Sequence, residues 1–260
     1  MNLKQITGIY FSPTESTKKV VESIVSEIHG NKESLDLTDA ASKRPDYSFT
    51  ENEAVVVGVP VYGGRVPQTA VERLLKLHGR QTPAVLVVTY GNRAYEDALT
   101  ELRDVLAGQG FKTAAAAAVV TEHNIIHSIA AGRPDQADKA ALKQFAQKVD
   151  ERFRTMQSTY GLENVAVKGK APYRPYGTIP FKIKVSGACN GCGLCIKKCP
   201  VQAISRTDPK VTDQERCISC MRCVKVCPVK GRKVSPFMLF MAGKKLKKVC
   251  GLRKEPEFFF

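Results

Sequence analysis

Two cysteine runs with the same spacing constrain this chain more than any other feature of its sequence. Each run reads C-x2-C-x2-C-x3-C-P; the first begins at Cys189 and the second at Cys217. This spacing is typical of proteins with two iron–sulfur clusters, in which the fourth cysteine of each run binds the cluster of the other run. We therefore expect two 4Fe-4S clusters. The first would be held by Cys189, Cys192, Cys195 and Cys227, and the second by Cys217, Cys220, Cys223 and Cys199.

A zinc site and disulfide bonds are the alternatives for these cysteines. A structural zinc site closes at four ligands, so each run would leave cysteines over. Cysteines two residues apart in tight loops are poorly placed for disulfide bonds. The segment Met1–Lys4 leads into a strand-like stretch without an export signal, and no run of 18 apolar residues follows. We expect a protein of the reducing cytoplasm, with Cys250 as an inert ninth thiol.

The cysteine-rich segment, residues 186–231, resembles the bacterial two-cluster ferredoxins. The family's C-P-x-x-A-I signature appears at residues 199–204. The second run departs from this signature, because Cys227-Pro228 is followed by Val-Lys-Gly. The resemblance implies a small α+β ferredoxin-like domain, which we place at residues 186–232.

The net charge is divided unevenly along the chain. Residues 1–158 carry 19 Lys/Arg and 19 Asp/Glu, whereas residues 159–260 carry 21 Lys/Arg and 6 Asp/Glu. Two oxidised clusters with their thiolates contribute about −4. Lys197, Lys198, Arg222 and Lys225 stand between the ligands and are expected to offset part of that charge. The second half remains basic, which suits an acidic protein, anionic lipid or nucleic acid, or else a solvated surface without a partner.

The first 158 residues alternate between strand and helix patterns. The order indicates a doubly wound parallel sheet, in which ligands bind beyond the carboxyl ends of the strands. Five consecutive alanines favour helix, yet the alternation requires a strand there. We expect strands at 3–11, 34–37, 54–60, 83–89 and 112–121, and helices after residues 17, 67 and 95 and at about 135–157.

Three loops follow strands in this pattern, at residues 12–17, 61–66 and 90–95. The first is rich in hydroxyl groups and precedes a helix, so its backbone N–H groups suit a phosphate, although Ser and Thr there can also be simple helix caps. The loop lacks the lysine of an ATP-binding P-loop, and no G-x-G-x-x-G motif indicates a dinucleotide site.

Residues 3–157 resemble the flavodoxins. Ser12-x-Thr14-x-x-Thr17 is similar to the family's phosphate loop, but Glu15 stands where the family has glycine. The resemblance implies strand order 2-1-3-4-5 and a bound FMN. It also implies that Tyr62-Gly63-Gly64 contacts the flavin and that Tyr90 or Tyr95 stacks on it, with simple packing of these tyrosines as the alternative. The expected FMN site comprises Ser12, Thr14, Ser16, Thr17, Tyr62, Gly63, Gly64, Tyr90, Gly91 and Tyr95.

The remaining segments are a linker and a tail. Residues 159–185 are rich in Gly and Pro and carry aromatic side chains that suggest packing against a domain. The basic tail, residues 233–260, is expected to be helical, either packed on its own domain or lying on an anionic membrane. The arrangement resembles the fused flavodoxin–ferredoxin proteins of anaerobes, and the segments 60–67 and 89–95 are similar to loops of that family.

Three functions fit these features. The first is electron transfer between the clusters and FMN, with an acidic ferredoxin or flavodoxin as the external partner. The second is an FMN-dependent reductase of a quinone or nitro compound, for which the sequence offers no acid–base pair. The third is nucleic-acid binding, which has charge in its favour but no recognition motif. Without a nicotinamide fingerprint, we expect electrons to arrive from another protein.

Overall fold

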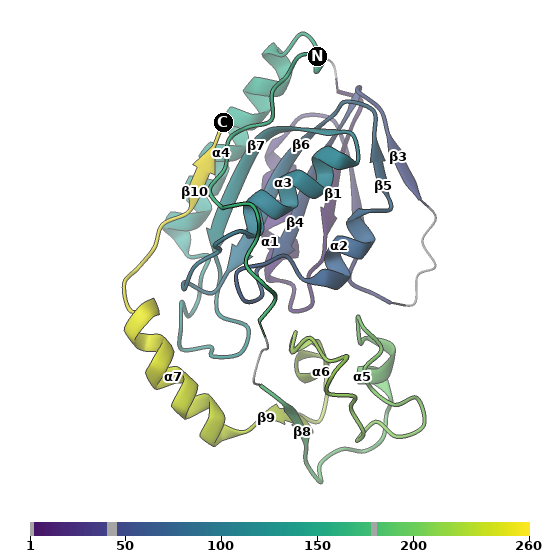
Figure 1. Ribbon diagram of the computed structural model, residues 1–260, viewed down its shortest axis with the longest axis vertical. Coiled ribbons are helices and arrows are strands. Elements are labelled where there is room, and N and C mark those ends of the chain that lie inside the picture. Colours follow the sequence, from purple (N-terminus) through teal and green to yellow (C-terminus); the bar gives the residue numbers. More distant parts are fainter. Residues whose placement is uncertain (1–2, 41–45, 178–180) are drawn as a thin grey trace.

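The computed structural model describes residues 3–40, 46–177 and 181–260, which form two unequal parts (Figure 1). The larger part is a sheet with helices on both faces. The smaller part lies beyond one end of that sheet and contains the cysteine runs. The last residues of the chain return from the smaller part to the larger one, so the two parts are linked twice by the backbone.

The larger part contains five parallel strands in the order 2-1-3-4-5, which confirms the flavodoxin-like arrangement. Their long apolar stretches are buried because helices cover both faces of the sheet. A sixth strand, which the sequence did not predict, pairs antiparallel with the last of them. Across the sheet the strands are β2 (Asn31–Asp36), β1 (Gln5–Tyr10), β4 (Glu53–Pro60), β6 (Thr82–Tyr90), β7 (Phe111–Val120) and β10 (Glu257–Phe259).

The alanine-rich segment is a strand, as the alternation required. Ala116 and Ala118 of β7 pack in the core on one face of the sheet, and Ala115 and Ala117 pack in the core on the other. All four are fully buried between helices. Tertiary packing therefore outweighs the helix preference of alanine at this position.

Four helices cover the sheet. On one face, α1 (Ser16–Glu27) packs beside α4 (Gln136–Thr155), and on the other lie α2 (Gln68–Leu74) and α3 (Ala98–Gly108). The apolar residues at helical spacing in α1, α3 and α4 are buried. The helical spacing of apolar residues after residue 67 predicts that Leu75 also faces inward, but Leu75 lies just after α2 and is 48% exposed, whereas Ala70 and Leu74 are buried. A separate pair of short strands, β3 (Tyr47–Phe49) and β5 (Leu77–Gly79), flanks α2.

The smaller part is an internal repeat of two cysteine loops. Each loop contains one short helix, α5 (Leu194–Lys197) or α6 (Arg222–Lys225), and the strands β8 (Ile183–Val185) and β9 (Arg232–Val234) pair at its base. Residues 28 positions apart share the left-handed backbone conformation that few side chains adopt. The pairs are Gly191 (φ 75°) with Ser219 (φ 50°), Gly193 (φ 72°) with Met221 (φ 62°), and Gln202 (φ 51°) with Lys230 (φ 51°).

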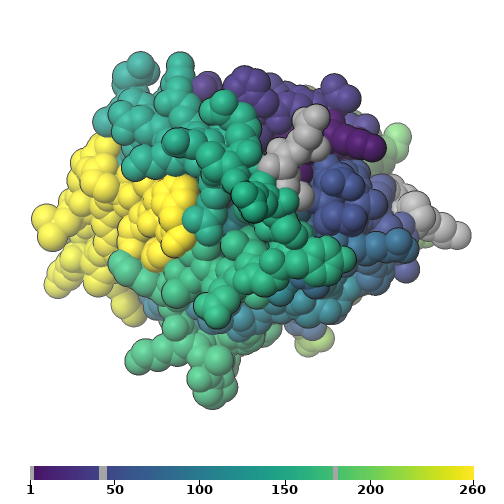
Figure 2. Space-filling model, turned by 90° about the horizontal axis from the view of Figure 1, so that it is seen from above, coloured from purple at the N-terminus to yellow at the C-terminus, as the bar shows by residue number. Residues whose placement is uncertain are grey.

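The tail begins with helix α7 (Pro236–Cys250), which lies in the range where a helix was predicted. Leu239, Leu246 and Cys250 pack with residues 125–129, whereas Phe237 and Phe240 on the opposite side are 72% and 58% exposed. The chain then returns to β10, where Phe258 stacks on Phe145 of α4 at 4.7 Å between ring centroids. Figure 2 shows these C-terminal residues lying against the helical layer of the larger part.

No helix of the described residues is both long and apolar enough to cross a membrane.

Candidate functional site

The second set of predicted cluster ligands comes together in one cavity. Cys199 and Cys217, which are 18 positions apart, line this cavity together with Cys220 and Cys223. Its remaining walls are mostly apolar. Burial raises the pKa of Cys220, and it raises that of Cys223 to about 11, with the neighbouring cysteines adding to both shifts. The free thiols would therefore stay protonated, and a bound cluster would have to displace their protons.

In the first set of predicted ligands, Gly231 lies next to both Cys227 and Cys189. Its backbone N–H donates to Cys227 Sγ at 3.2 Å. A Cβ at Gly231 would lie 3.1 Å from the backbone nitrogen of Cys189, so the chain from the second run passes directly over the start of the first. In the equivalent position of the repeat, Ala203 N–H donates to Cys199 Sγ at 3.3 Å. The fourth cysteine of each run thus accepts a backbone hydrogen bond at its sulfur from the residue four positions later. Of the two fourth cysteines, Cys199 lines the cavity of the other run.

The basic residues between the cysteines contact the larger part of the molecule. Lys198 Nζ and Arg222 Nη2 each lie 2.9 Å from a carboxylate oxygen of Asp39. Burial acts to raise the pKa of Asp39, but hydrogen bonds and charges from these two cations outweigh it and lower the pKa. Lys198 and Arg222 thus dock the cluster loops on the sheet domain. Their offset of cluster charge stays a prediction.

A pocket opens where the carboxyl ends of β1, β4, β6 and β7 meet. It combines loops from four strands, as expected for a ligand site in a doubly wound sheet. Five of its residues carry hydroxyl groups on Ser or Thr, and two are tyrosines. The lining residues are Pro13, Thr14, Ser16, Thr17, Pro60, Val61, Tyr62, Thr89, Tyr90, Gly91, Thr121, Glu122 and Asn124.

The 12–17 loop is fixed by some of its own hydroxyl groups. Ser12 Oγ accepts a hydrogen bond from Lys18 N–H at 3.0 Å, and Thr17 Oγ1 is bonded to Thr89 Oγ1 at 2.7 Å. Both residues are buried. Thr14 and Ser16 are half-buried and face the pocket at the start of α1. Their hydroxyl groups and the positive end of this 12-residue helix fit a phosphate group.

Glu15 turns away from the phosphate position. Its backbone has φ 68°, the left-handed conformation that explains why related loops prefer glycine here. Its carboxylate lies 2.8 Å from Lys225 Nζ, and the same amine donates to the carbonyl of Thr14 at 2.7 Å. The hydrogen bond from Lys225 lowers the pKa of Glu15. The charge that would repel a phosphate is therefore paired with the cluster domain.

The second loop forms a tight turn between Tyr62 and Arg65. Gly63 and Gly64 occupy it with φ of 63° and 87°, and Gly63 is exposed at its tip. Neither glycine lines the pocket, whereas Tyr62 does. Burial raises the pKa of Tyr62, and proximity to the Cys220 thiol adds to the shift.

A buried ion pair holds this turn in place. Arg65 Nε and Nη2 each lie 2.8 Å from the carboxylate of Glu101 on α3, and Val66 N–H donates to the same carboxylate at 2.9 Å. The ring of Tyr176 lies 4.1 Å from the Arg65 guanidinium carbon. The linker is thus packed on the larger domain, as its aromatic residues suggested.

In the third loop, Tyr90 and Gly91 reach the pocket but Tyr95 does not. Tyr95 is buried in the core beneath α3, and its hydroxyl donates to Glu257 of β10 at 3.0 Å. We therefore correct the expectation that Tyr95 could stack on a flavin. Gly91 is needed because a Cβ there would lie 2.6 Å from the ring of His123.

Three lining residues that the sequence analysis missed follow β7. Thr121, Glu122 and Asn124 complete the wall opposite the second loop. Their position directly after the fifth predicted strand was the signal that could have identified them, because loops at this edge of a parallel sheet converge. The pocket thus offers hydroxyl groups for a phosphate and two tyrosines for a ring system.

The cysteine-rich part of the chain matches a known family of domains. Residues 188–231 match the family of 4Fe-4S dicluster domains. No match to a curated protein was found. Among solved structures, a flavodoxin from the domain Archaea is 15% identical, with a TM-score of 0.40, over 58% of this chain and 99% of its own.

Two further flavodoxins cover the same part of the chain. The Streptococcus pneumonia TIGR4 flavodoxin is 15% identical, with a TM-score of 0.41, over 57% of this chain and 99% of its own. The Fusobacterium nucleatum flavodoxin bound to flavin mononucleotide is 12% identical, with a TM-score of 0.39, over 58% and 98%. The strand order and its terminal loops define the flavodoxin-like fold of this chain.

Proposed function

We propose that this chain, which joins a flavodoxin-like domain to a 4Fe-4S dicluster domain, passes electrons between two 4Fe-4S clusters and a bound FMN. It would link an external ferredoxin-like carrier to an acceptor that exchanges electrons with the flavin. Iron–sulfur clusters exchange single electrons, whereas a flavin can accept one or two. The chain's own contribution is to hold the two kinds of cofactor site next to each other.

The observation that supports this proposal is the contact between the two candidate sites. From the cluster domain, Arg222 Nη1 lies 3.4 Å from the carbonyl of Ser12, and Lys225 binds the carbonyl of Thr14. The loop that would bind the FMN phosphate is therefore built partly by the helix that carries Cys223.

The cofactor content tests the first part of the proposal. After anaerobic reconstitution, the protein should contain about eight iron atoms per chain in two 4Fe-4S clusters. Flavin extracted from it should be FMN, because the pocket offers one phosphate loop. Iron and sulfide assays with chromatography of the extracted flavin measure both. Bound zinc, about four iron atoms, or FAD would contradict it.

A second candidate function is reduction of a small molecule, such as a quinone or nitro compound, at an FMN that receives its electrons from the clusters. One observation favours it: a larger cavity adjoins the candidate flavin pocket and shares Thr14, Ser16, Glu122 and Asn124 with it.

We further propose that the basic half of the chain docks an acidic electron-transfer protein. With about −4 from two clusters, residues 159–260 keep about +11. Opposite charges raise association rates by about 10–10³, and salt screens the effect over roughly 10 Å at 0.1 M. The rate at which an acidic ferredoxin reduces the clusters should therefore fall steeply as salt rises.

Stopped-flow absorbance over a salt series measures this rate. A rate that is the same at low and high salt would contradict electrostatic docking. Binding to anionic vesicles that disappears when residues 236–260 are deleted would assign the charge to a membrane surface instead. Salt-sensitive binding to DNA or RNA would assign it to nucleic acid.

A further inference from the structure

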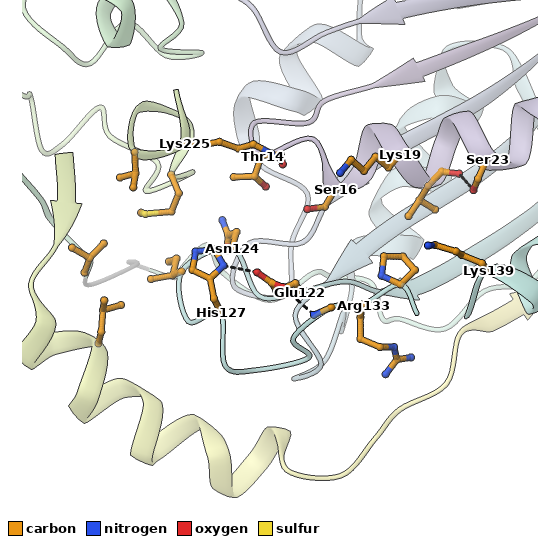
Figure 3. Close-up of a pocket in the computed structure, with 18 of the residues that line it drawn as sticks. Thr14, Ser16, Lys19, Ser23, Glu122, Asn124, His127, Arg133, Lys139 and Lys225 are labelled. Atoms are coloured by element: carbon orange, nitrogen blue, oxygen red, sulfur yellow. Dashed lines mark hydrogen bonds and ion pairs between the residues drawn. The ribbon is translucent and has the colours of Figure 1, made fainter. Parts of the chain in front are cut away.

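A large cavity lies between the two domains, beside the candidate flavin pocket (Figure 3). Its volume is about 770 Å³, within the range of small-molecule sites. Its walls come from α1, α4, the loop after β7, α6, β9 and α7. Residues from both domains and from the tail are thus needed to build it.

The cavity carries lysines whose charge is not paired within the described part of the chain. Lys19 of α1 and Lys139 of α4 reach into one side of it, and Lys233 of β9 also lines it. Lys19, Lys139 and Lys233 take part in none of the ion pairs among residues 3–40, 46–177 and 181–260. The shared field of these lysines favours an anion in the cavity.

The other charged groups of the cavity already have partners. Arg133 is bonded to the buried carboxylate of Asp138, with Nη2 at 2.6 Å from one oxygen. Lys225 is paired with Glu15. His127 Nδ1 lies 2.6 Å from a carboxylate oxygen of Glu122. The cations available to a ligand are therefore Lys19, Lys139 and Lys233. Of these, Lys19 and Lys139 lie on the same side of the cavity in Figure 3.

Much of the remaining wall is apolar and comes from α1, α4, the cluster domain and α7. Val20 and Leu142 come from the helices that carry the two lysines. Met221, Val224 and Val234 come from the cluster domain, and Leu239 comes from α7. An inorganic anion would leave this surface wet, whereas a neutral apolar molecule would leave the lysines without a partner. The site is suited to a molecule that has both a negative charge and an apolar part.

We propose that this cavity binds a small organic anion with an apolar body. Its charged group would lie between Lys19 and Lys139, and its body would pack against the cluster domain and α7. The residues shared with the flavin pocket would then place such a ligand next to the flavin. This inference goes beyond the proposed electron transfer, and its binding step does not depend on that function.

The probe for the test is 2-naphthoate, compared with the neutral 2-naphthamide of nearly the same shape. Naphthoate does not accept electrons from a flavin, so its binding is measured separately from any redox activity. Titration calorimetry of the full chain with its clusters reconstituted should show naphthoate binding at least about tenfold more tightly than naphthamide. One charge-assisted contact of about 1.4 kcal/mol accounts for that factor.

The double variant Lys19→Gln/Lys139→Gln should bind naphthoate about tenfold more weakly and bind naphthamide as before. Lys143→Gln, which removes an exposed charge from the same helix outside the cavity, is the matched control and should change neither affinity. Leu239→Ala should weaken the binding of naphthoate and of naphthamide equally. Equal binding of naphthoate and naphthamide to the wild type, or a naphthoate preference that survives the double substitution, would overturn the proposal.

Discussion

Replacement of Cys199 by alanine should remove the cluster that is held by residues 18 or more positions further along the chain. Cys199 lines the cavity formed by Cys217, Cys220 and Cys223. Its neighbour in sequence, Cys195, belongs to the other set of ligands. The iron content should therefore fall from about eight to about four atoms per chain, since the cluster of the first three cysteines keeps all four ligands. Iron and sulfide assays after anaerobic reconstitution measure the change.

Cys250→Ala is the matched control for this variant. Cys250 is the last residue of α7 and packs with residues 125–129. It is not among the residues that line the cavity of Cys199, Cys217, Cys220 and Cys223, so this variant should keep both clusters. Cys227→Ala should instead damage the cluster of Cys189, Cys192 and Cys195. Loss of the cluster of Cys189, Cys192 and Cys195 in the Cys199→Ala protein would show that the runs do not exchange ligands.

The double substitution Thr14→Ala/Ser16→Ala should weaken FMN binding by about 10²–10⁴-fold. Both residues face the pocket at the start of α1, where the FMN phosphate is expected. Each lost hydrogen bond to a charged phosphate is worth about 1.5–3 kcal/mol, and about 1.4 kcal/mol corresponds to a factor of ten. Equilibrium titration of the flavin-free protein with FMN, followed by flavin fluorescence, measures the loss.

Ser26→Ala on the exposed side of α1 is the control for this substitution, since the Ser26 hydroxyl is bonded to the carbonyl of Ser23. FMN affinity should remain at the wild-type value in that variant. The Thr17 hydroxyl is bonded to Thr89, so Thr17→Ala would test the fixing of the loop more than the binding of phosphate. If the Thr14/Ser16 variant binds FMN as tightly as the wild type, the phosphate does not lie in this loop.

Local sequence patterns were sufficient to predict the sheet and the position of the dicluster domain. Long apolar runs at regular intervals predicted five parallel strands, and their order followed from the resemblance carried by the 12–17 loop. The cysteine spacing indicated the dicluster domain because the two short loops are constrained by their own backbone, as the positive φ angles of Gly193 and Met221 illustrate. In both cases, the information lies within a few tens of residues.

Features that depend on distant contacts were not predictable in this way. The strand at Glu257–Phe259 forms only because β7 offers it a free edge. Glu257 of this strand accepts a hydrogen bond from the Tyr95 hydroxyl, which holds this tyrosine away from the pocket. The pairing of Arg222 and Lys225 with Asp39 and Glu15 joins residues more than 180 positions apart. Without an alignment of related sequences, no local pattern indicates such pairs.

Rapid mixing tests the proposed electron transfer between the clusters and a flavin in the neighbouring pocket. The oxidised protein is mixed anaerobically with a reduced acidic ferredoxin, and the absorbance of clusters and flavin is followed. The clusters should bleach first, flavin reduction should follow, and Cys199→Ala should slow flavin reduction at equal flavin content. Flavin that is reduced as fast in Cys199→Ala as in the wild type would contradict the proposal.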